Sequence, residues 1–121
     1  MKMETAAKYM KVILRLREKY GEVKSVRVAD DMLVSRPTVC VALQQLQKDG
    51  MIELDENREI HFTQTGEAFA RKVTERYQFF LDYFIKLGLP ERIAEKDASV
   101  LEYSLSDECY AVLRFKTSES K

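Results

Sequence analysis

The chain contains 121 residues, 45% of them hydrophobic and 33% charged, and its 20 basic side chains balance its 20 acidic ones. That length predicts one domain, or one small domain with an appended dimerisation element. A single histidine and the lack of CxxC, HExxH, GxGxxG and P-loop patterns argue against an enzyme. The sequence has no long apolar run and no signal-peptide core, so we expect a cytoplasmic protein that does not enter a membrane.

The first predicted helix covers residues 5–19. Tyr9, Ile13 and Leu16 recur at helical spacing and form one apolar face. Gly21 follows them, and glycine favours the end of a helix because it adopts a left-handed conformation easily.

Residues 26–50 predict a helix, a tight turn at 33–35 and a second helix. Ser35 can cap the free N–H groups at the start of the second helix, and Gly50 suits a left-handed stop at its end. The apolar residues of the second helix recur at spacings of three and four, so they form one buried stripe. They are Val39, Ala42, Leu43 and Leu46.

The opposite face of this second helix offers short polar and basic side chains, which suits the major groove of double-stranded DNA. Arg36 could contact guanine or a phosphate, and Gln44 could pair with adenine. An ordinary packed helical hairpin is the alternative interpretation. The predicted DNA-binding residues of this stretch are Arg27, Ser35, Arg36, Pro37, Thr38, Cys40, Val41, Gln44 and Lys48.

Two short strands are expected next, because apolar and polar residues alternate in 51–54 and again in 59–63. The tip between them contains turn-prone Asp and Asn residues. A helix-turn-helix followed by such a hairpin is a winged helix, and Arg58 at the tip could reach a phosphate or the minor groove. His61 has no evident ligand partner, and we interpret it as structural.

The charges are divided unevenly between the two halves of the chain. Residues 1–50 contain 10 Lys or Arg against 6 Asp or Glu, whereas residues 51–121 contain 10 against 14. The local field matters more for phosphate binding than the total charge does. A field this mild predicts modest affinity for DNA per protomer, so we expect a dimer to bind.

The second half of the chain predicts three more helices, which makes the fold mostly α with a small β-hairpin wing. A long helix covers 64–87, another begins near Pro90, and a short one runs from Ser106 to about Phe115. We therefore divide the chain into a winged helix-turn-helix DNA-binding domain and a helical dimerisation domain. Their predicted bounds are 1–63 and 64–121.

The long helix carries more aromatic surface than one winged helix needs. Packing against the other helices is one explanation. A homodimer seam is the other, because a winged helix that reads a palindrome needs a twofold partner. The residues predicted for this seam are Phe79, Phe80, Tyr83 and Phe84.

Three stretches resemble a known family: AAKYMKVILRL, VRVADDMLVSRPTVCVALQQLQKDGMIEL, and IHFTQTGEAFARKVTERYQFFLDYFIKLGLP followed by DASVLEYSLSDE. They resemble metal-dependent transcriptional repressors of the diphtheria-toxin-repressor and manganese-transport-regulator type. The resemblance implies a winged helix, a helical dimerisation domain, DNA binding as a homodimer and control by Mn²⁺ or Fe²⁺. It implies a short member, without the SH3-like domain that longer members carry.

The resemblance also implies six metal-ligand positions, which the family fills mainly with carboxylates and histidines. Only Glu102 is a good ligand among the residues that this chain places there, and two lysines would repel a divalent ion. We therefore predict that the usual metal site is absent and that no metal cofactor is used. The residues at these positions are Lys8, Lys11, Tyr77, Ser99, Glu102 and Tyr103.

In this interpretation Lys11 or Lys8 pairs with Glu102 and replaces the metal as a link between the first helix and the dimerisation domain. Solvated lysines with no tie to Glu102 are the simpler alternative. A rearranged metal site could instead combine Glu102 with Asp97 or Glu95. A protein of another class, a winged-helix interaction module that does not bind DNA, is a further alternative, because the acids of the wing would repel phosphate.

Overall fold

The computed structural model describes residues 1–119, and within it the chain divides into two compact units. Unit 1 covers Met1–Glu75 and unit 2 covers Arg76–Lys121, and the division falls inside one long helix, α4 (Gln64–Lys86). The functional boundary predicted between residues 63 and 64 stays a prediction.

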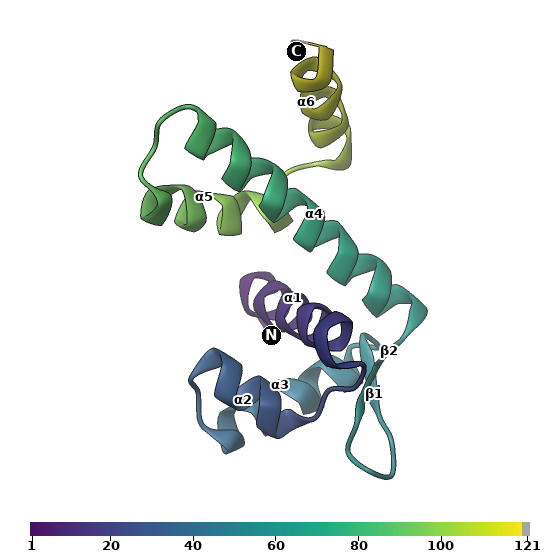
Figure 1. The fold of residues 1–121 in the computed structure, drawn as a ribbon. Helices are drawn as coiled ribbons and strands as arrows, with labels where there is room; N and C mark the ends of the chain where they lie inside the picture. Colours follow the sequence, from purple (N-terminus) through teal and green to yellow (C-terminus); the bar gives the residue numbers. More distant parts are fainter. Residues whose placement is uncertain (120–121) are drawn as a thin grey trace. The chain divides into compact units, whose positions relative to one another are not determined.

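Unit 1 is a bundle of short helices with a hairpin beside it (Figure 1). Its elements are α1 (Met3–Tyr20), α2 (Ser25–Met32), α3 (Arg36–Lys48), β1 (Ile52–Leu54), β2 (Ile60–Phe62) and the first part of α4. One continuous core joins them, because each element turns an apolar face inward. The stripe predicted for the second motif helix is confirmed, since Val39, Ala42, Leu43 and Leu46 are all buried.

Left-handed residues and one side-chain cap set the bounds of these helices. Gly21 ends α1 with a φ of 85°, and Leu33 ends α2 with a φ of 57°, where its amide donates to the carbonyl of Ala29. Leu33 is uncommon there because a side chain disfavours this conformation. Ser35 then caps α3, since its Oγ accepts the amide of Thr38 at 3.2 Å.

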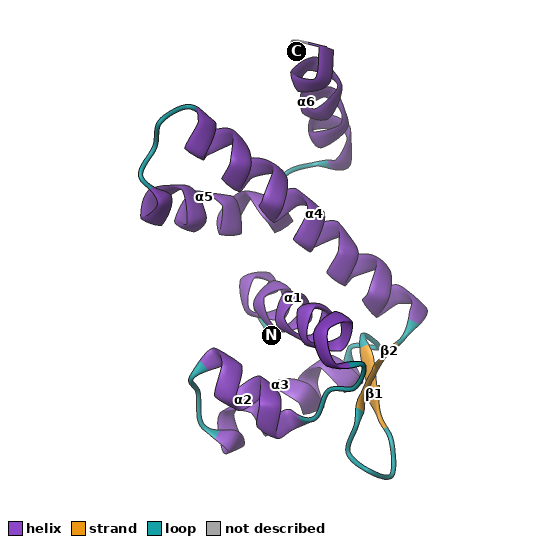
Figure 2. Ribbon diagram, in the orientation of Figure 1, coloured by secondary structure: helices purple, strands orange, loops and turns teal. Residues whose placement is uncertain are grey.

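The two strands pair antiparallel, with Ile52 opposite Phe62 and Leu54 opposite Ile60 (Figure 2). Ile52 and Ile60 are buried in the core, so the alternation read from the sequence places the apolar residues on the inner face. The amide of Ile60 also donates to the carbonyl of Val23 at 2.8 Å, which ties the hairpin to the segment between α1 and α2.

The start of α4 is locked against the hairpin by a threonine and a glycine. Thr63 accepts the amide of Gly66 through its Oγ1 at 3.0 Å and donates the same hydroxyl to the carbonyl of Gly50. A Cβ placed on Gly66 would lie 1.8 Å from the carbonyl oxygen of Met51. Only glycine allows the helix to approach the chain this closely.

Unit 2 consists of the second part of α4, α5 (Glu91–Ser104) and α6 (Asp107–Glu119). Arg76 is buried and donates to the carbonyl of Leu105 at 2.7 Å and to the carboxylate of Asp107, which fixes the segment between α5 and α6. The ring of Tyr110 on α6 contacts Phe79 edge-on, with centroids 5.4 Å apart.

The predicted fold class is confirmed: the described chain is mostly helical, with one two-stranded hairpin as its wing. None of the helices in the described residues is long and apolar enough to cross a membrane.

Candidate nucleic-acid interface

The first turn of α3 is capped by Ser35 and exposed to solvent. Ser35 and Thr38 share a hydroxyl hydrogen bond of 2.7 Å, and the Ser35 cap leaves the first turn of the helix exposed. Pro37 stands in this first turn, where its fixed φ suits a helix and the missing N–H costs nothing. The result is a rigid, exposed helix end with positive dipole character.

One face of α3 continues from this turn and stays open along the helix. Val41 has 68% of its surface exposed. Cys40 is half-buried and carries a free thiol. The structure thus brings most of the predicted DNA-binding residues onto one exposed surface: Ser35, Arg36, Pro37, Thr38, Val41, Gln44 and Lys48.

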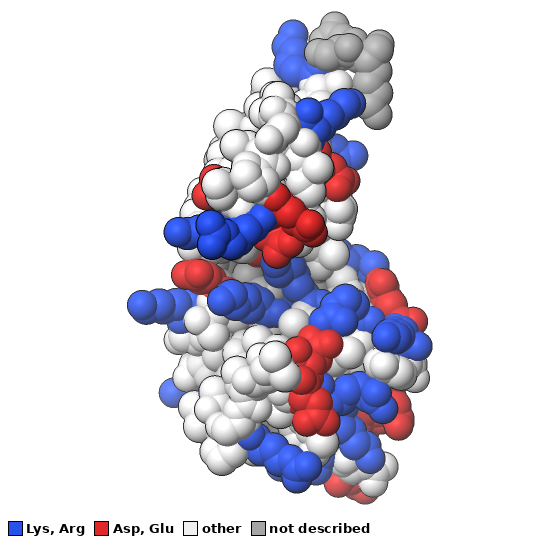
Figure 3. Space-filling model, turned by 60° about the vertical axis from the view of Figure 1, so that its left-hand side comes forward, with Lys and Arg blue, Asp and Glu red and all other residues white. Residues whose placement is uncertain are grey.

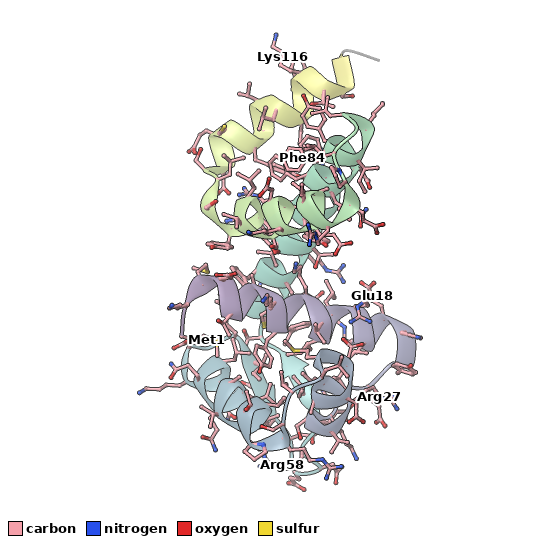
Figure 4. All side chains as sticks on the ribbon, turned by 90° about the vertical axis from the view of Figure 1, so that its left-hand side faces the viewer. Met1, Glu18, Arg27, Arg58, Phe84 and Lys116 are labelled. Carbon is pink, nitrogen blue, oxygen red and sulfur yellow. The ribbon has the colours of Figure 1, made fainter. Side chains whose placement is uncertain are left out.

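Arg27 and Arg58, predicted to bind the DNA backbone, lie on other elements of unit 1 (Figure 4). Arg27 is on α2, and its guanidinium stacks over the ring of Tyr20 at 3.9 Å from the centroid. Arg58 is exposed at the tip of the hairpin and has a left-handed backbone, with a φ of 63°. Both guanidinium groups remain accessible from solvent, as a phosphate contact requires.

The face drawn in Figure 3 carries basic side chains beside acidic ones. Several of these charges pair within unit 1, including Arg15 with Asp31, and Arg17 with Glu67 at 2.8 Å. Paired charges contribute less to the attraction of a phosphate backbone.

The wing holds a cluster that the sequence interpretation missed. His61 is not without a partner, because its Nε2 lies 2.9 Å from Oδ2 of Asp55 and 3.7 Å from Oε2 of Glu59. The hydrogen bond from His61 lowers the pKa of Asp55 to about 2, and the same bond raises the pKa of His61. One ligand atom from each of the three residues lies within 4.8 Å of the others, close enough to hold one metal ion.

The pattern that could have revealed this cluster is the alternation of the hairpin. Because Glu53 pairs with His61, and Leu54 with Ile60, the residues Glu53, Asp55, Glu59 and His61 all project from the outer face. Diagonal neighbours on one face of a hairpin are within reach of long side chains. Given this register, the alternation places Asp55 and His61 on the same face.

Comparisons with known proteins agree with this architecture. Residues 1–60 match the family model described as the iron dependent repressor, N-terminal DNA binding domain. The transcriptional regulator MntR of Escherichia coli O6:H1 is 32% identical over 111 residues, which are 92% of this chain and 72% of that protein. The iron-dependent repressor IdeR of Mycobacterium leprae is 24% identical over 107 residues, 88% of this chain and 46% of that protein.

A solved structure extends the likeness to the fold. The manganese-dependent transcriptional repressor in complex with manganese superposes with a TM-score of 0.74 at 25% identity, covering 92% of this chain and 51% of that one. The chain belongs to the iron-dependent repressor family. The named relatives are transcriptional regulators, and the family is not enzymatic, so the prediction that this chain is no enzyme is confirmed.

The prediction that no metal cofactor is used is contradicted. One relative is named an iron-dependent repressor, one solved neighbour is a complex with manganese, and the wing of this chain carries a group of possible metal ligands. The prediction treated the loss of ligands at the family positions as the loss of metal binding altogether. It overlooked that donors on another element can hold an ion.

Several residues at the family's ligand positions have partners of their own within the described chain. Within unit 2, the Ser99 hydroxyl donates to the carbonyl of Lys96 at 2.7 Å, and burial, with the carboxylates of Glu95, Glu102 and Glu91, raises the pKa of Tyr77. Glu102 is buried and is the one carboxylate of the set, which also includes Lys8, Lys11 and Tyr103. The predicted link between a lysine and Glu102 stays a prediction.

The residues of the predicted dimer interface differ in how much of their surface is exposed. Phe80 is buried within the described chain, and its ring packs edge-on against Phe79 at 5.1 Å. Tyr83 is exposed and stacks on Phe84, with centroids 6.1 Å apart. Phe80 thus contributes to the core of unit 2, whereas Tyr83 has surface left for an intermolecular contact.

Proposed function

We propose that this chain is a homodimeric winged-helix repressor that binds double-stranded DNA and responds to Mn²⁺ or Fe²⁺. The observation that carries the proposal is the exposed face of α3, whose capped first turn presents Arg36 and Thr38 beside an open stripe that includes Val41 and Gln44. A helix that buries one side and offers such groups on the other matches the shape and chemistry of the major groove.

The metal response rests on the chemistry of the wing. Asp55, Glu59 and His61 offer two carboxylates and an imidazole, donors that suit Mn²⁺ and Fe²⁺. An ion held there would offset negative charge close to Arg58, the wing residue expected to approach DNA. A rearranged site around Glu102, with Asp97 or Glu95, is the second location that we propose to test.

The homodimer rests on the apolar surface that unit 2 leaves exposed. Tyr83, Leu87, Val112 and Phe115 have between 36% and 65% of their surfaces open. Monomeric proteins rarely expose large contiguous apolar patches, and such patches mark interaction surfaces. A second copy of unit 2 would supply the twofold partner that a palindromic site requires.

One experiment tests the function: fluorescence anisotropy of DNA from the region upstream of the chain's own gene, titrated with protein in Mn²⁺ and in chelator. We expect tighter binding with Mn²⁺, and Arg36→Ala should weaken it by about 1–3 kcal/mol if Arg36 reads a base. Equal binding of this DNA and of a scrambled duplex would contradict specific recognition. Equal binding in Mn²⁺ and chelator would contradict the metal response.

Calorimetry with Mn²⁺ alone locates the ion. We expect His61→Ala to abolish binding if the wing holds the metal, whereas Glu102→Ala should abolish it if the rearranged site does. Retention of binding in both variants would rule out both locations.

The acids of the wing favour a second candidate function, a module that binds proteins in place of DNA. Glu53, Asp55, Glu56 and Glu59 are gathered on one short hairpin and would repel phosphate. The same anisotropy titration separates the two functions, because an interaction module of this kind would leave every duplex unbound.

A further inference from the structure

The tip of the wing is organised around one carboxylate. Asp55 accepts two backbone amides through its Oδ1, from Asn57 at 2.8 Å and from Glu59 at 2.9 Å. Its own amide donates to the carbonyl of Glu59 at 3.1 Å, and its carbonyl accepts the amide of Arg58 at 3.0 Å. All four hydrogen bonds lie within residues 55–59, the turn that contains Arg58.

The conformation held by these bonds is one that arginine does not adopt by preference. Arg58 has a φ of 63°, in the left-handed region, where a side chain crowds the backbone and glycine or asparagine is usual. The amides immediately before and after Arg58 both donate to Asp55. The carboxylate therefore fixes the chain on either side of Arg58 and determines the direction in which its side chain leaves the hairpin.

The second oxygen of Asp55 ties the tip to the strand behind it. Oδ2 lies 2.9 Å from Nε2 of His61 on β2, so the tip is fastened to β2 as well as to its own backbone. His61 therefore orients the carboxylate of Asp55, and this carboxylate orders the backbone of the turn. The contacts run from His61 through Asp55 to the backbone around Arg58.

We propose that Asp55 is a positioning residue that holds Arg58 for contact with a DNA phosphate, with His61 as its second anchor. The inference rests on the proposed DNA-binding function. It predicts a change in DNA affinity opposite to the one expected from charge alone. An acid beside DNA repels phosphate, so removal of any wing acid should strengthen binding. If Asp55 positions Arg58, removal of this one acid weakens binding.

The test compares three variants by DNA anisotropy at several salt concentrations in chelator, so that loss of a candidate metal ligand does not contribute to the result. Asp55→Ala removes both the charge and the acceptor, Asp55→Asn removes the charge but keeps an oxygen for the two amides, and Glu56→Ala is the matched control. Glu56 is exposed next to Asp55, and its side chain makes no hydrogen bond within the described part of the chain. Circular dichroism melts establish that each variant is folded.

We expect Asp55→Ala to weaken DNA binding roughly fivefold and to lower the slope of log affinity against log salt by about one, the loss of one phosphate contact. Arg58→Ala should show the same two changes, and the double variant should show no further loss. Glu56→Ala should bind slightly more tightly than the parent, and Asp55→Asn should restore binding to the parent level or above. A merely structural aspartate would not change the salt slope or share its effect with Arg58.

Hydrogen exchange of the free protein provides a second readout that needs no DNA. The amides of Asn57 and Glu59 should be protected in the parent and in Glu56→Ala, and unprotected in Asp55→Ala. Parent-level DNA binding by folded Asp55→Ala, or additive effects of Asp55→Ala and Arg58→Ala, would overturn the inference and leave the proposed function standing. Absence of DNA binding by the parent protein would overturn both.

Discussion

Unit 1 buries a core of its own, whereas unit 2 leaves most of its apolar side chains partly or fully exposed. One cluster of fifteen buried apolar residues joins every helix and strand of unit 1. In the described part of unit 2, the buried apolar residues are Phe80, Ala94 and Ala98, two of them too small to bury much area. At the same time Leu87, Val112 and Phe115 are more than half exposed.

The difference shows where each unit obtains its stability. Buried apolar area is the main favourable contribution to folding, so unit 1 has what it needs within one chain. Unit 2 is held by contacts of another kind, such as the buried guanidinium of Arg76 at the carbonyl of Leu105 and over the ring of Tyr110. Its uncovered apolar groups are the physical reason to expect a second copy.

The largest effect is expected from a cavity in the core of unit 1. Leu46→Ala should lower the free energy of unfolding by about 2–5 kcal/mol, because the side chain is fully buried and its removal leaves a void. Val41→Ala on the exposed face of the same helix is the matched control and should change it by less than about 0.5 kcal/mol. Urea denaturation measures both. A small loss for Leu46→Ala would mean that the core of unit 1 does not carry its stability.

The next effect concerns the contact between α4 and the hairpin. Gly66→Ala should destabilise unit 1 by about 1–3 kcal/mol, because its Cβ would meet the backbone of Met51, which cannot move aside as a side chain can. Gly21→Ala is the control, since a Cβ there meets nothing and only the positive φ opposes it. If thermal melts show Gly66→Ala to be the milder of the two, the close approach is not needed for the fold.

A smaller change is expected from the surface of unit 2. Tyr83→Ser with Phe115→Ser should raise the dimer dissociation constant about tenfold or more, since well-packed aromatic residues at interfaces contribute about 1 kcal/mol or more each. Sedimentation equilibrium measures the constant. Glu108→Ser, on the exposed surface of α6, should leave it unchanged. An unchanged dimer in the aromatic variant would place the seam elsewhere.

The elements could be predicted because their causes are local. The stripe of α3, the cap at Ser35 and the left-handed stop at Gly50, whose φ is 76°, each depend on residues within a turn or two of one another. The end of α2 was harder to read, since it uses Leu33 in a conformation that residue type does not favour. There the surrounding structure, and not the residue, determines the backbone.

The site was predicted less completely because its contacts join separate segments. The open face of α3 follows from its buried stripe, so the predicted DNA contacts on this helix share one surface. The bond between Asp55 and His61 depends on the register of the hairpin, which fixes which residues share a face. The residues at the family's ligand positions carried no information about donors that the hairpin brings together.

The smallest expected effect is a pH dependence of the stability of the wing. It distinguishes a His61 that is hydrogen-bonded to Asp55 from one that is not. Because the pKa of His61 is raised from 6.5, its contribution to stability is fully present below pH 6.5 and is lost as the pH rises through the raised pKa. The pKa of Asp55 is lowered from 3.8 to about 2, so its contribution is present above pH 3.8 and is lost as the pH falls toward 2. The pair therefore stabilises the wing most between about pH 4 and pH 6.5.

His61 is the one histidine of the sequence, so its imidazole signals can be followed by NMR without ambiguity. We expect a titration midpoint above the ordinary histidine value, and a return toward that value in Asp55→Asn, where the charged partner is gone. Glu56→Gln removes the same charge from a neighbouring residue that does not touch the ring, so it should shift the midpoint much less. Equal shifts in the two variants would mean that His61 senses the general negative charge of the hairpin, and the bond to Asp55 would then not be what anchors the tip.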